Sequence, residues 1–303
     1  MNYNLVTILG PTATGKTRIA AKLAKDMNGE IISADSRQVY RNMDIGTGKD
    51  LIEFQKEDIK YHLIDIIDPS EEYNLFRFIK DFQSSYKEIT LNGKFPVMVG
   101  GTGLYISSIL QSYFLPAASN ETELEKLSSH SLDELKDILL KLKPKLHNKT
   151  DLTSKDRLVR AILIEKSRGK TKKSFADINS LNIGVKLHRE EVKKRITKRL
   201  KERLDNGMIE EVKGLLHKGI SSEKLNYFGL EYKFVSQYIN GKLNYNDMFQ
   251  KLNSSIHNFA KRQMTWFRKM EREGVEINWF SPDNYLAIKN FVTQKLNESK
   301  NIS

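Results

Sequence analysis

The segment from Gly10 to Thr17, Gly-Pro-Thr-Ala-Thr-Gly-Lys-Thr, constrains the fold of this chain more than any other. It matches the phosphate-loop pattern G-x-x-x-x-G-K-[ST] in full, and it lies between an apolar run, Tyr3–Leu9, and a stretch with helical spacing, Thr17–Met27. A loop of this kind turns backbone N–H groups toward a phosphate, and the N-terminus of the following helix adds a partial positive charge. We therefore predict a strand, a loop that binds a diphosphate or a triphosphate, and a helix.

Two side chains of this loop carry chemistry of their own. Lys16 can reach the outer phosphates, and the hydroxyl of Thr17 can hold Mg²⁺. The other expected diphosphate contacts are Gly10, Thr12, Ala13, Thr14 and Gly15. The pattern does not identify the molecule that carries the phosphates.

Strands alternate with helices through the first third of the chain. We predict strands at Glu30–Ala34, His62–Ile67 and Phe95–Val99, and an amphipathic helix at Leu75–Leu91. Such βα units fold into a parallel sheet. After Pro116 helices predominate, and the pattern therefore predicts an α/β core with a mostly helical addition, either inserted or C-terminal. The later strands are expected at Asn182–Leu187 and Glu276–Phe280, and the helices at Glu121–Lys141, Ser154–Arg168, Glu190–His217 with a break near Asn206-Gly207, Asn246–Arg272 and Tyr285–Leu296.

Basic residues are concentrated in the middle of the chain. The 303 residues include 50 Lys and Arg against 38 Asp and Glu, a net charge of +12. Residues 141–218 hold 23 bases and 10 acids, a net charge of +13, whereas residues 1–140 have a net charge of −5 and residues 219–303 one of +4. A polyanion that contacts the middle segment, most commonly a nucleic acid, explains this distribution. A solvated, lysine-rich surface is the alternative.

Composition excludes several classes of protein. The chain has no cysteine, which excludes disulfide scaffolds, thiolate zinc sites and cysteine nucleophiles. Its six histidines show no metal-binding spacing. No run of about 18 apolar residues predicts a transmembrane helix, and the first residues lack the basic start and long apolar stretch of a signal peptide. We therefore expect a cytoplasmic protein that does not enter a membrane.

Polar residues at the carboxyl ends of the predicted strands are candidates for a site, because ligands of open parallel sheets bind there. Asp35 follows the second strand and is placed to act as a general base or near Mg²⁺. Thr102, within Gly100–Gly103, offers a hydroxyl where small residues let a ligand approach the backbone. Asp65 and Asp68 are placed to contact Mg²⁺ as the acid of a Walker B strand does. For Asp35 and for Thr102 a turn or a helix cap is the alternative.

Seven segments, in this order, resemble the tRNA dimethylallyltransferases, also called tRNA isopentenyltransferases, in their bacterial form. The segments are Gly10–Thr17, Ser33–Tyr40, Met43–Lys49, His62–Pro69, Val99–Tyr105, Asp156–Ala161 and Ala260–Arg268. The phosphate loop alone is unspecific. The ordered combination of Asp-Ser-Arg-Gln-x-Tyr, Gly-Gly-Thr-Gly-Leu-Tyr and Ala-Lys-Arg-Gln-x-Thr-Trp-Phe-Arg is highly specific, and the resemblance extends over nearly the whole chain.

The resemblance implies an α/β fold with a P-loop NTPase-like parallel sheet core and a mostly helical, basic insertion lobe. We expect residues 1–118 and about 183–303 to form the core with its helical C-terminal part. Residues of about 119–182 are then expected to form the lobe that binds tRNA.

The resemblance also implies an activity, the transfer of a dimethylallyl group from dimethylallyl diphosphate to N6 of the adenosine at tRNA position 37, next to the anticodon. The products are N6-dimethylallyladenosine and diphosphate, and the expected cofactor is Mg²⁺. In this family the phosphate loop holds the isoprenoid diphosphate rather than ATP. The expected partners are dimethylallyl diphosphate and the tRNA anticodon stem-loop, and the expected state is a monomer.

Individual roles are carried over only at matching positions. Asp35 matches the general base for the N6 amine, Thr102 the hydroxyl in that region of the site, and Arg199 an arginine that assists the diphosphate. The residues that match tRNA-contacting segments are Asp35, Ser36, Arg37, Gln38, Asp156, Arg157, Arg160 and Lys233. The aromatic residues near the basic helices either stack on bases or fill the core; they are Tyr232, Trp266 and Phe267.

The sequence also departs from the family pattern. The family's Gly-Tyr-Lys/Arg turn corresponds to Gly229–Lys233, where Glu231 occupies the glycine position. An acidic stretch, Glu121–Glu125, stands where some members carry an arginine, and the absence of a zinc-finger extension fits the bacterial form. Two other interpretations stay open. A small-molecule P-loop kinase explains the phosphate loop and Asp35 but not the basic segment, and the third possibility is a non-catalytic RNA-binding protein.

Overall fold

The computed structural model describes residues 2–111, 126, 127, 129–142, 144, 155–167 and 178–300. The chain divides into two compact units, Met1–Leu110 with Ile178–Ser303, and Gln111–Asp177. Each unit buries apolar side chains of its own. Among the described residues, no helix is both long enough and apolar enough to cross a membrane.

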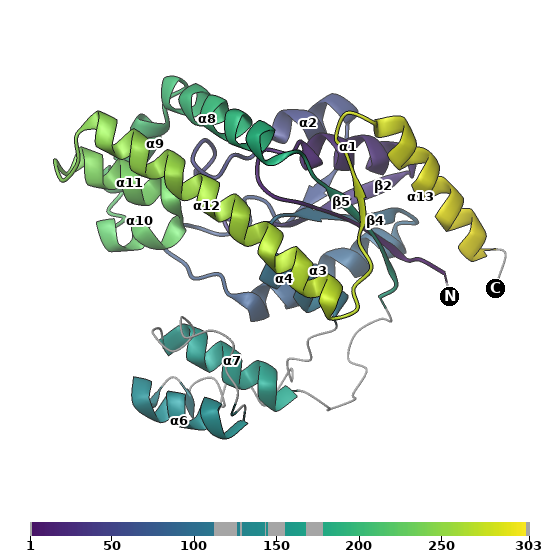
Figure 1. Ribbon diagram of the computed structural model, residues 1–303, viewed down its shortest axis with the longest axis horizontal. Coiled ribbons are helices and arrows are strands. Elements are labelled where there is room, and N and C mark those ends of the chain that lie inside the picture. The colour runs from purple at the N-terminus through teal and green to yellow at the C-terminus, as the bar shows by residue number, and fades with distance from the viewer. Residues whose placement is uncertain are drawn as a thin grey trace. The chain divides into compact units, whose positions relative to one another are not determined.

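A parallel sheet forms the centre of the first unit (Figure 1). In the described part of the chain it has six strands, in the order β3-β2-β4-β1-β5-β6. Their bounds are β1 Leu5–Leu9, β2 Gly29–Ala34, β3 Tyr61–His62, β4 Phe95–Gly100, β5 Ser180–Val185 and β6 Asn278–Phe280. Every residue of the central strand β1 is buried, as a parallel strand covered on both faces requires. The predicted α/β fold with a parallel sheet is confirmed.

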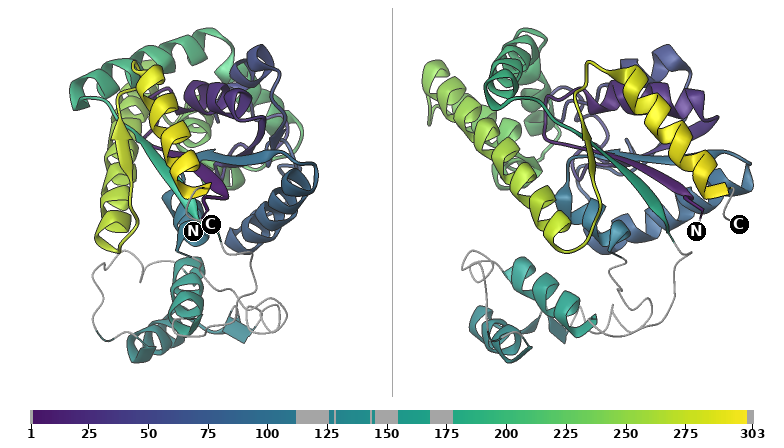
Figure 2. Two further views of the ribbon diagram at one scale, coloured as in Figure 1. Left: turned by 90° about the vertical axis from the view of Figure 1, so that its right-hand side faces the viewer. Right: turned by 45° about the vertical axis from the view of Figure 1, so that its right-hand side comes forward.

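Helices cover both faces of this sheet (Figures 1 and 2). On one face, α1 (Lys16–Asp26), α2 (Leu51–Glu57) and α13 (Tyr285–Lys300) share one apolar core with the strands. On the other face, α3 (Leu75–Leu91) packs on β2 and β4 and contacts α4 (Gly103–Leu110). The remaining helices of this unit before β6 are α8 (Arg189–Asp205), α9 (Met208–His217), α10 (Ser222–Phe228), α11 (Leu230–Ile239) and α12 (Tyr245–Arg272). Helix α12 contacts α4, α8 and α11, α9 contacts α8 and α11, and α10 contacts α11.

Helix α12 is amphipathic along its 28 residues. The side chain of Asn244 caps its start by accepting a hydrogen bond from the backbone N–H of Asp247. Its buried residues follow a helical spacing of three or four; they are Met248, Leu252, Ile256, Ala260, Gln263, Phe267 and Met270. A polar residue, Gln263, thus interrupts an otherwise apolar face.

Two predicted elements differ from the observed ones. The predicted strand at His62–Ile67 is wrong beyond His62, because Leu63 and Asp65 have positive φ angles of 64° and 57° that end the ladder. The predicted helix Glu190–His217 is divided into α8 and α9, and the break near Asn206-Gly207 is confirmed, with Gly207 at φ 95°.

In the second unit, α6 (Leu132–Leu142) and α7 (Lys155–Ser167) pack against each other. Leucines of α6 and aliphatic residues of α7 are buried; they are Leu135, Leu139, Leu158, Val159, Ile162 and Leu163. The N-terminal part of the helix predicted at Glu121–Lys141, including Glu121–Glu125, lies outside the described residues.

Candidate active site

The phosphate loop begins where β1 runs beside β5. Gly10 lies so close to the backbone carbonyl of Val185 that a Cβ at this position would collide with it. Gly15 precedes α1 with a left-handed backbone, φ 78°, which glycine adopts without strain. Inside the loop, the hydroxyl of Thr14 donates to the carbonyl of Pro11 over 2.9 Å. The loop is therefore fixed by its own contacts, and it leads into the N-terminus of α1, which attracts anions.

Lys16 lies among charged side chains from several parts of the chain. Its Nζ donates to the carbonyl of Pro11 over 3.1 Å. Burial lowers the pKa of Lys16 from 10.5 to about 8; the carboxylate of Asp35 opposes this shift, the guanidinium of Arg199 adds to it, and the carboxylate of Asp50 opposes it. The structure thus brings together Lys16, Asp35 and Arg199, which sequence analysis had placed in one site.

Gln263 of α12 connects the phosphate loop to the end of β4. Its Oε1 accepts from the backbone N–H of Thr12 over 2.9 Å, and its Nε2 donates to the carbonyl of Gly101 over 2.9 Å. The side chain is buried, and a Cβ on Gly101 would lie 2.5 Å from Nε2. Trp266 packs in the same way on Gly103, where a Cβ would collide with its ring. Glycine is therefore needed at both positions because α12 lies against this turn.

Sequence analysis assigned no role to Gln263, although it lies in one of the motifs quoted there. A glutamine at a buried position of an apolar helix face is the signal that identifies it. A buried amide must find partners, and its partners here are two backbone groups at the phosphate loop and at the end of β4.

Asp35 and Thr102 lie on adjacent strand ends. Asp35 Oδ1 accepts from the backbone N–H of Arg37 over 2.9 Å, which closes the turn after β2. The hydroxyl of Thr102 accepts from the backbone N–H of Ser36 over 3.1 Å, and its own N–H donates to the carbonyl of Ala34. Thr102 therefore fixes the turn that carries Asp35, whose carboxylate is half-buried.

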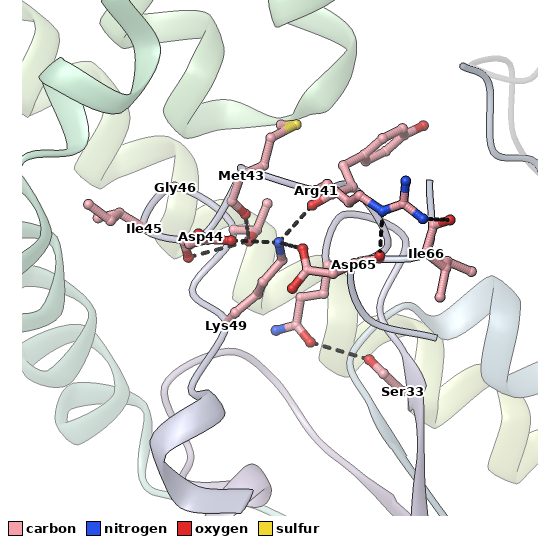
Figure 3. A network of polar contacts seen from close by, with 12 residues as sticks. Ser33, Arg41, Met43, Asp44, Ile45, Gly46, Lys49, Asp65 and Ile66 are labelled. Carbon is pink, nitrogen blue, oxygen red and sulfur yellow. Dashed lines mark hydrogen bonds and ion pairs between the residues drawn. The ribbon is translucent and has the colours of Figure 1, made fainter. Parts of the chain in front are cut away.

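A buried lysine organises the loop that follows this turn (Figure 3). The Nζ of Lys49 donates to the carbonyl of Tyr40 over 2.6 Å and to Asp44 Oδ1 over 2.7 Å, and it also pairs with Asp65. Arg41 donates to the backbone carbonyl of Asp65 over 2.9 Å. The carboxylate of Asp65, which the sequence placed near Mg²⁺, is thus engaged by Lys49.

Glu211 of α9 holds the same loop from the other side. Its carboxylate accepts from the backbone N–H groups of Asp44, Ile45 and Gly46 at 2.8, 2.7 and 2.9 Å. The hydroxyl of Tyr232 donates to the same carboxylate over 2.8 Å. Three consecutive N–H groups on one carboxylate fix the loop backbone, since hydrogen bonds to a charged acceptor are strong. No local pattern in the sequence indicates this contact, because Glu211 and the loop are far apart in the chain.

Two arginines of α8 reach the segment from Gly46 to Asp50. Arg199 Nη2 lies 2.9 Å from both carboxylate oxygens of Asp50 and 3.2 Å from the carbonyl of Gly48. Arg203 Nη1 donates to Glu231 Oε1 over 3.3 Å and to the carbonyl of Gly46 over 3.4 Å. Burial raises the pKa of Glu231, and the guanidinium of Arg203 opposes this shift. Glu231 thus has a defined ion-pair partner at the position where the family pattern has glycine.

A small pocket lies between these arginines and the phosphate loop. Two loop residues, three aliphatic side chains and three charged side chains line it; they are Thr12, Ala13, Ile196, Leu200, Ile256, Arg199, Arg203 and Glu231. Two guanidinium groups are thus placed beside the phosphate loop, where they suit an anionic ligand. A more open hollow lies elsewhere on α8, lined by Glu190, Lys193, Lys194, Thr197, Lys198 and Lys201.

Similarity to known proteins identifies the family. The family model described as "IPP transferase" matches residues 38–270, and the one described as "Isopentenyl transferase" matches residues 3–65. The chain belongs to the IPP transferase family. The resemblance inferred from the seven sequence segments is thereby confirmed.

Relatives of this chain are similar to it over nearly their whole length. A tRNA dimethylallyltransferase 2 of Bacteroides fragilis is 50% identical over 304 residues, which cover 98% of this chain and 99% of the relative. A tRNA dimethylallyltransferase 2 of Citrifermentans bemidjiense is 50% identical over 277 residues, which cover 91% and 90%. The crystal structure of the full-length tRNA isopentenylpyrophosphate transferase from Bacillus halodurans is similar with a TM-score of 0.73 and 33% identity, covering 99% of this chain and 98% of that one.

The residues of this chain that match tRNA-contacting segments of the family have different surroundings. The guanidinium of Arg37 stacks over the exposed ring of Tyr227 at 4.8 Å, and the Nζ of Lys233 lies 5.5 Å from the ring of Phe234. The side-chain amide of Gln38 accepts a hydrogen bond from the hydroxyl of Ser33 and donates one to the carbonyl of Gly48. The three matching residues of α7 have side chains outside the described residues; they are Asp156, Arg157 and Arg160.

Of the three aromatic residues considered for base stacking, two are unavailable. Tyr232 is buried against Gly46 and bonded to Glu211, and Phe267 is completely buried in the core. Stacking of bases on these two rings is therefore excluded. Trp266 is half-buried, and Lys269 lies 5.3 Å from its ring.

Proposed function

We propose that this chain transfers a dimethylallyl group from dimethylallyl diphosphate to N6 of the adenosine at position 37 of a tRNA, next to the anticodon. Membership of the IPP transferase family and 50% identity to proteins named tRNA dimethylallyltransferase support this proposal. We infer it above all from the surroundings of Lys16 in the phosphate loop: burial lowers its pKa, the carboxylate of Asp35 opposes this shift, and the guanidinium of Arg199 adds to it. A phosphate-binding lysine between a carboxylate and an arginine provides a base for the acceptor and cations for the leaving group.

Proton removal is the first requirement of the reaction. The exocyclic amine of adenine is a weak nucleophile, because its lone pair is delocalised into the ring. We assign Asp35 as the base that takes the N6 proton while the bond from N6 to C1 of the dimethylallyl group forms. Thr102 keeps the turn of Asp35 in place through Ser36. A partly buried carboxylate with a backbone partner is well oriented for this step.

Charge on the leaving group is the second requirement. As the bond from C1 to the diphosphate oxygen breaks, the departing diphosphate gains negative charge. We assign Lys16, the loop N–H groups and Arg199 to the neutralisation of that charge, since fixed donors act strongly in a site shielded from water. The remaining loop contacts are assigned to Gly10, Thr12, Ala13, Thr14, Gly15 and Thr17.

The residues around Thr17 fit a magnesium ion. Mg²⁺ is commonly bound by one or two protein oxygens together with phosphate oxygens and waters. Thr17 provides a half-buried hydroxyl in the first turn of α1, and no group of three metal-ligating side chains exists among the residues that the structure describes. We therefore assign Thr17 as the protein ligand. When bound, the ion supplies further charge neutralisation to the diphosphate.

We assign the grip on tRNA to the basic middle of the chain and to the turn after β2. The contacting residues are expected among Asp35, Ser36, Arg37, Gln38, Asp156, Arg157, Arg160 and Lys233. The lobe formed by residues of about 119–182 is expected to hold the anticodon stem through its phosphates. The target adenosine must leave its stack to reach Asp35, and bases in single-stranded loops are extruded at low cost.

Mass analysis of tRNA nucleosides tests the proposal. After incubation of unmodified tRNA with the protein, dimethylallyl diphosphate and Mg²⁺, we expect adenosine to gain one dimethylallyl group at position 37. Asp35→Asn, which keeps the shape of the side chain and removes the base, is the matched control and should modify the tRNA far more slowly. An unmodified tRNA pool with the wild-type protein would contradict the proposal. Thermal stabilisation by ATP but not by dimethylallyl diphosphate would favour a small-molecule kinase instead.

A further inference from the structure

Arg199 uses one edge of its guanidinium for the protein. Its Nη2 contacts both carboxylate oxygens of Asp50 and the carbonyl of Gly48. Within the part of the chain that the structure describes, Nε and Nη1 donate to no acceptor. The arginine lines the pocket beside Thr12 and Ala13 of the phosphate loop. One edge is therefore held by Asp50, while the donors of the other edge are available to a ligand.

Asp50 occupies the N-cap position of α2 without capping it. An aspartate at this position ordinarily accepts a hydrogen bond from the second or third backbone N–H of its helix. Here its side chain makes no such bond, and both of its oxygens face Arg199. The carboxylate of Asp50 therefore does not stabilise the start of α2 by capping it. It binds Arg199 of α8 instead.

The ion pair is too exposed for stability to be its main effect. The side chain of Asp50 is 43% exposed and that of Arg199 is 28% exposed. Pairs of this exposure contribute little to the free energy of unfolding. The pair does restrict the orientation of Arg199, because a free arginine side chain samples many rotamers and the contact with Asp50 selects among them.

The backbone that carries Asp50 is fixed from two sides. Glu211 binds three consecutive N–H groups of the preceding loop, and the buried Nζ of Lys49 binds Tyr40, Asp44 and Asp65 (Figure 3). Gly48, the second partner of Arg199, lies between these anchors, and a Cβ there would collide with the guanidinium groups of α8. Asp50 therefore extends from an anchored segment rather than from a free loop.

We propose that Asp50 is a positioning residue, which holds one edge of Arg199 so that the other edge faces the diphosphate bound at the phosphate loop. This inference rests on the proposed transfer reaction. Asp50 acts through Arg199, touches neither substrate, and keeps the guanidinium beside Lys16 before the diphosphate arrives. A donor that is already in place needs no reorganisation when charge develops on the leaving group.

Single-turnover transfer rates at saturating tRNA and dimethylallyl diphosphate test this role. The central variant is Asp50→Ser, because serine can still cap α2 but is too short to reach Arg199. We expect its rate to fall about 10- to 100-fold, the scale of a misplaced catalytic group, with the thermal midpoint unchanged. Asp50→Asn keeps one acceptor oxygen and should recover part of the rate. Glu57→Gln, which lies in the same helix as Asp50 and removes an ion pair with Lys25 of α1, is the matched control and should be silent.

A double-mutant cycle with Arg199→Ala separates the positioning role from an independent one. If Asp50 acts through Arg199, the rate of Asp50→Ser/Arg199→Ala equals that of Arg199→Ala alone. Multiplying effects, or a wild-type rate for Asp50→Ser, would overturn the inference while leaving the transfer reaction intact. Absence of transfer by the wild-type protein would instead overturn the proposed function, and this inference with it.

Discussion

At the scale of single residues, burial of Lys16 lowers its pKa, so its positive charge costs the folded state free energy. The pKa of Lys16 is 10.5 in the unfolded chain and about 8 in the folded one. Below pH 8 the lysine is protonated in both states, so the folded chain bears the full cost of the buried charge. Between pH 8 and 10.5 the folded state releases its proton first, and the cost disappears as the pH rises.

We therefore expect Lys16→Met to stabilise the protein at neutral pH. The pKa shift means that the buried charge costs the folded state about 3 kcal/mol at neutral pH. Removal of the lysine also removes its hydrogen bond to Pro11, which lowers the gain in stability by about 1 kcal/mol. Urea unfolding should show a gain of about 2 kcal/mol at pH 7 that vanishes near pH 10. The same difference at both pH values would mean that burial of the charge is not its cause.

Asp35→Asn keeps the shape of the side chain and removes the base. We expect transfer to slow by about 100-fold or more, since general base catalysis contributes on this scale. Affinity for tRNA should stay close to that of the wild type, because the amide can still accept from the N–H of Arg37. Steady-state rates and equilibrium tRNA binding check both expectations, with Asp68→Asn as the control, whose carboxylate closes a separate exposed turn. Normal turnover of Asp35→Asn would remove Asp35 from the role of base.

Motif residues near strand ends could be placed from the sequence, and residues whose partners lie far away in the chain could not. Lys16 follows β1 through the phosphate loop, and Thr102 comes just after β4, so strand prediction also predicts where they lie. Asp50 resembles an ordinary helix cap, and Glu211 an ordinary exposed acid on a helix. Their partners lie about 150 residues away along the chain, and only the folded structure shows those contacts.

At the scale of elements, α12 links two segments of the site that are distant in sequence. Gln263→Ala leaves the N–H of Thr12 and the carbonyl of Gly101 without their partner, at a cost of about 1–3 kcal/mol for each group that stays buried. We expect a loss of about 3 kcal/mol in the free energy of unfolding and weaker binding of diphosphate. Denaturant titration and calorimetry measure the two effects. Lys261→Ala, an exposed position of the same helix, should change neither.

If Gln263→Ala lowered stability but left diphosphate affinity intact, α12 would support the fold without shaping the phosphate loop. The helix itself was predictable from its apolar spacing, which the structure follows over its whole length. The bounds of strand β3 were not predictable in this way, because the apolar residues after His62 are buried in an irregular turn rather than in a ladder. Apolar composition indicates burial, and it does not distinguish a strand from a buried turn.

At the scale of the whole molecule, the basic excess is shared by both units. Residues 141–177 hold 12 bases and 4 acids, and residues 178–218 hold 11 bases and 6 acids. Within α8 several bases already have carboxylate partners, including Arg195, Arg199 and Arg203. Lys194 and Lys201 are exposed and have no ion pair among the described residues. Together with Arg189, which is likewise exposed and has no ion pair in the described part of the chain, they are the cations of α8 that an RNA phosphate can reach without displacing a carboxylate.

Salt dependence therefore separates the two ligands. If about six phosphates of tRNA are neutralised, its affinity should fall by about three orders of magnitude between 50 and 200 mM salt. Affinity for dimethylallyl diphosphate should fall much less, because a single diphosphate is bound largely by fixed donors in a pocket. Replacement of Lys194 and Lys201 by glutamine should reduce the slope for tRNA by about 2 and leave diphosphate affinity unchanged. Lys87→Gln, on α3 in the acidic part of the chain, is the control. An unchanged slope in the double variant would assign the grip to Gln111–Asp177, and equal slopes for both ligands would exclude a separate grip on tRNA.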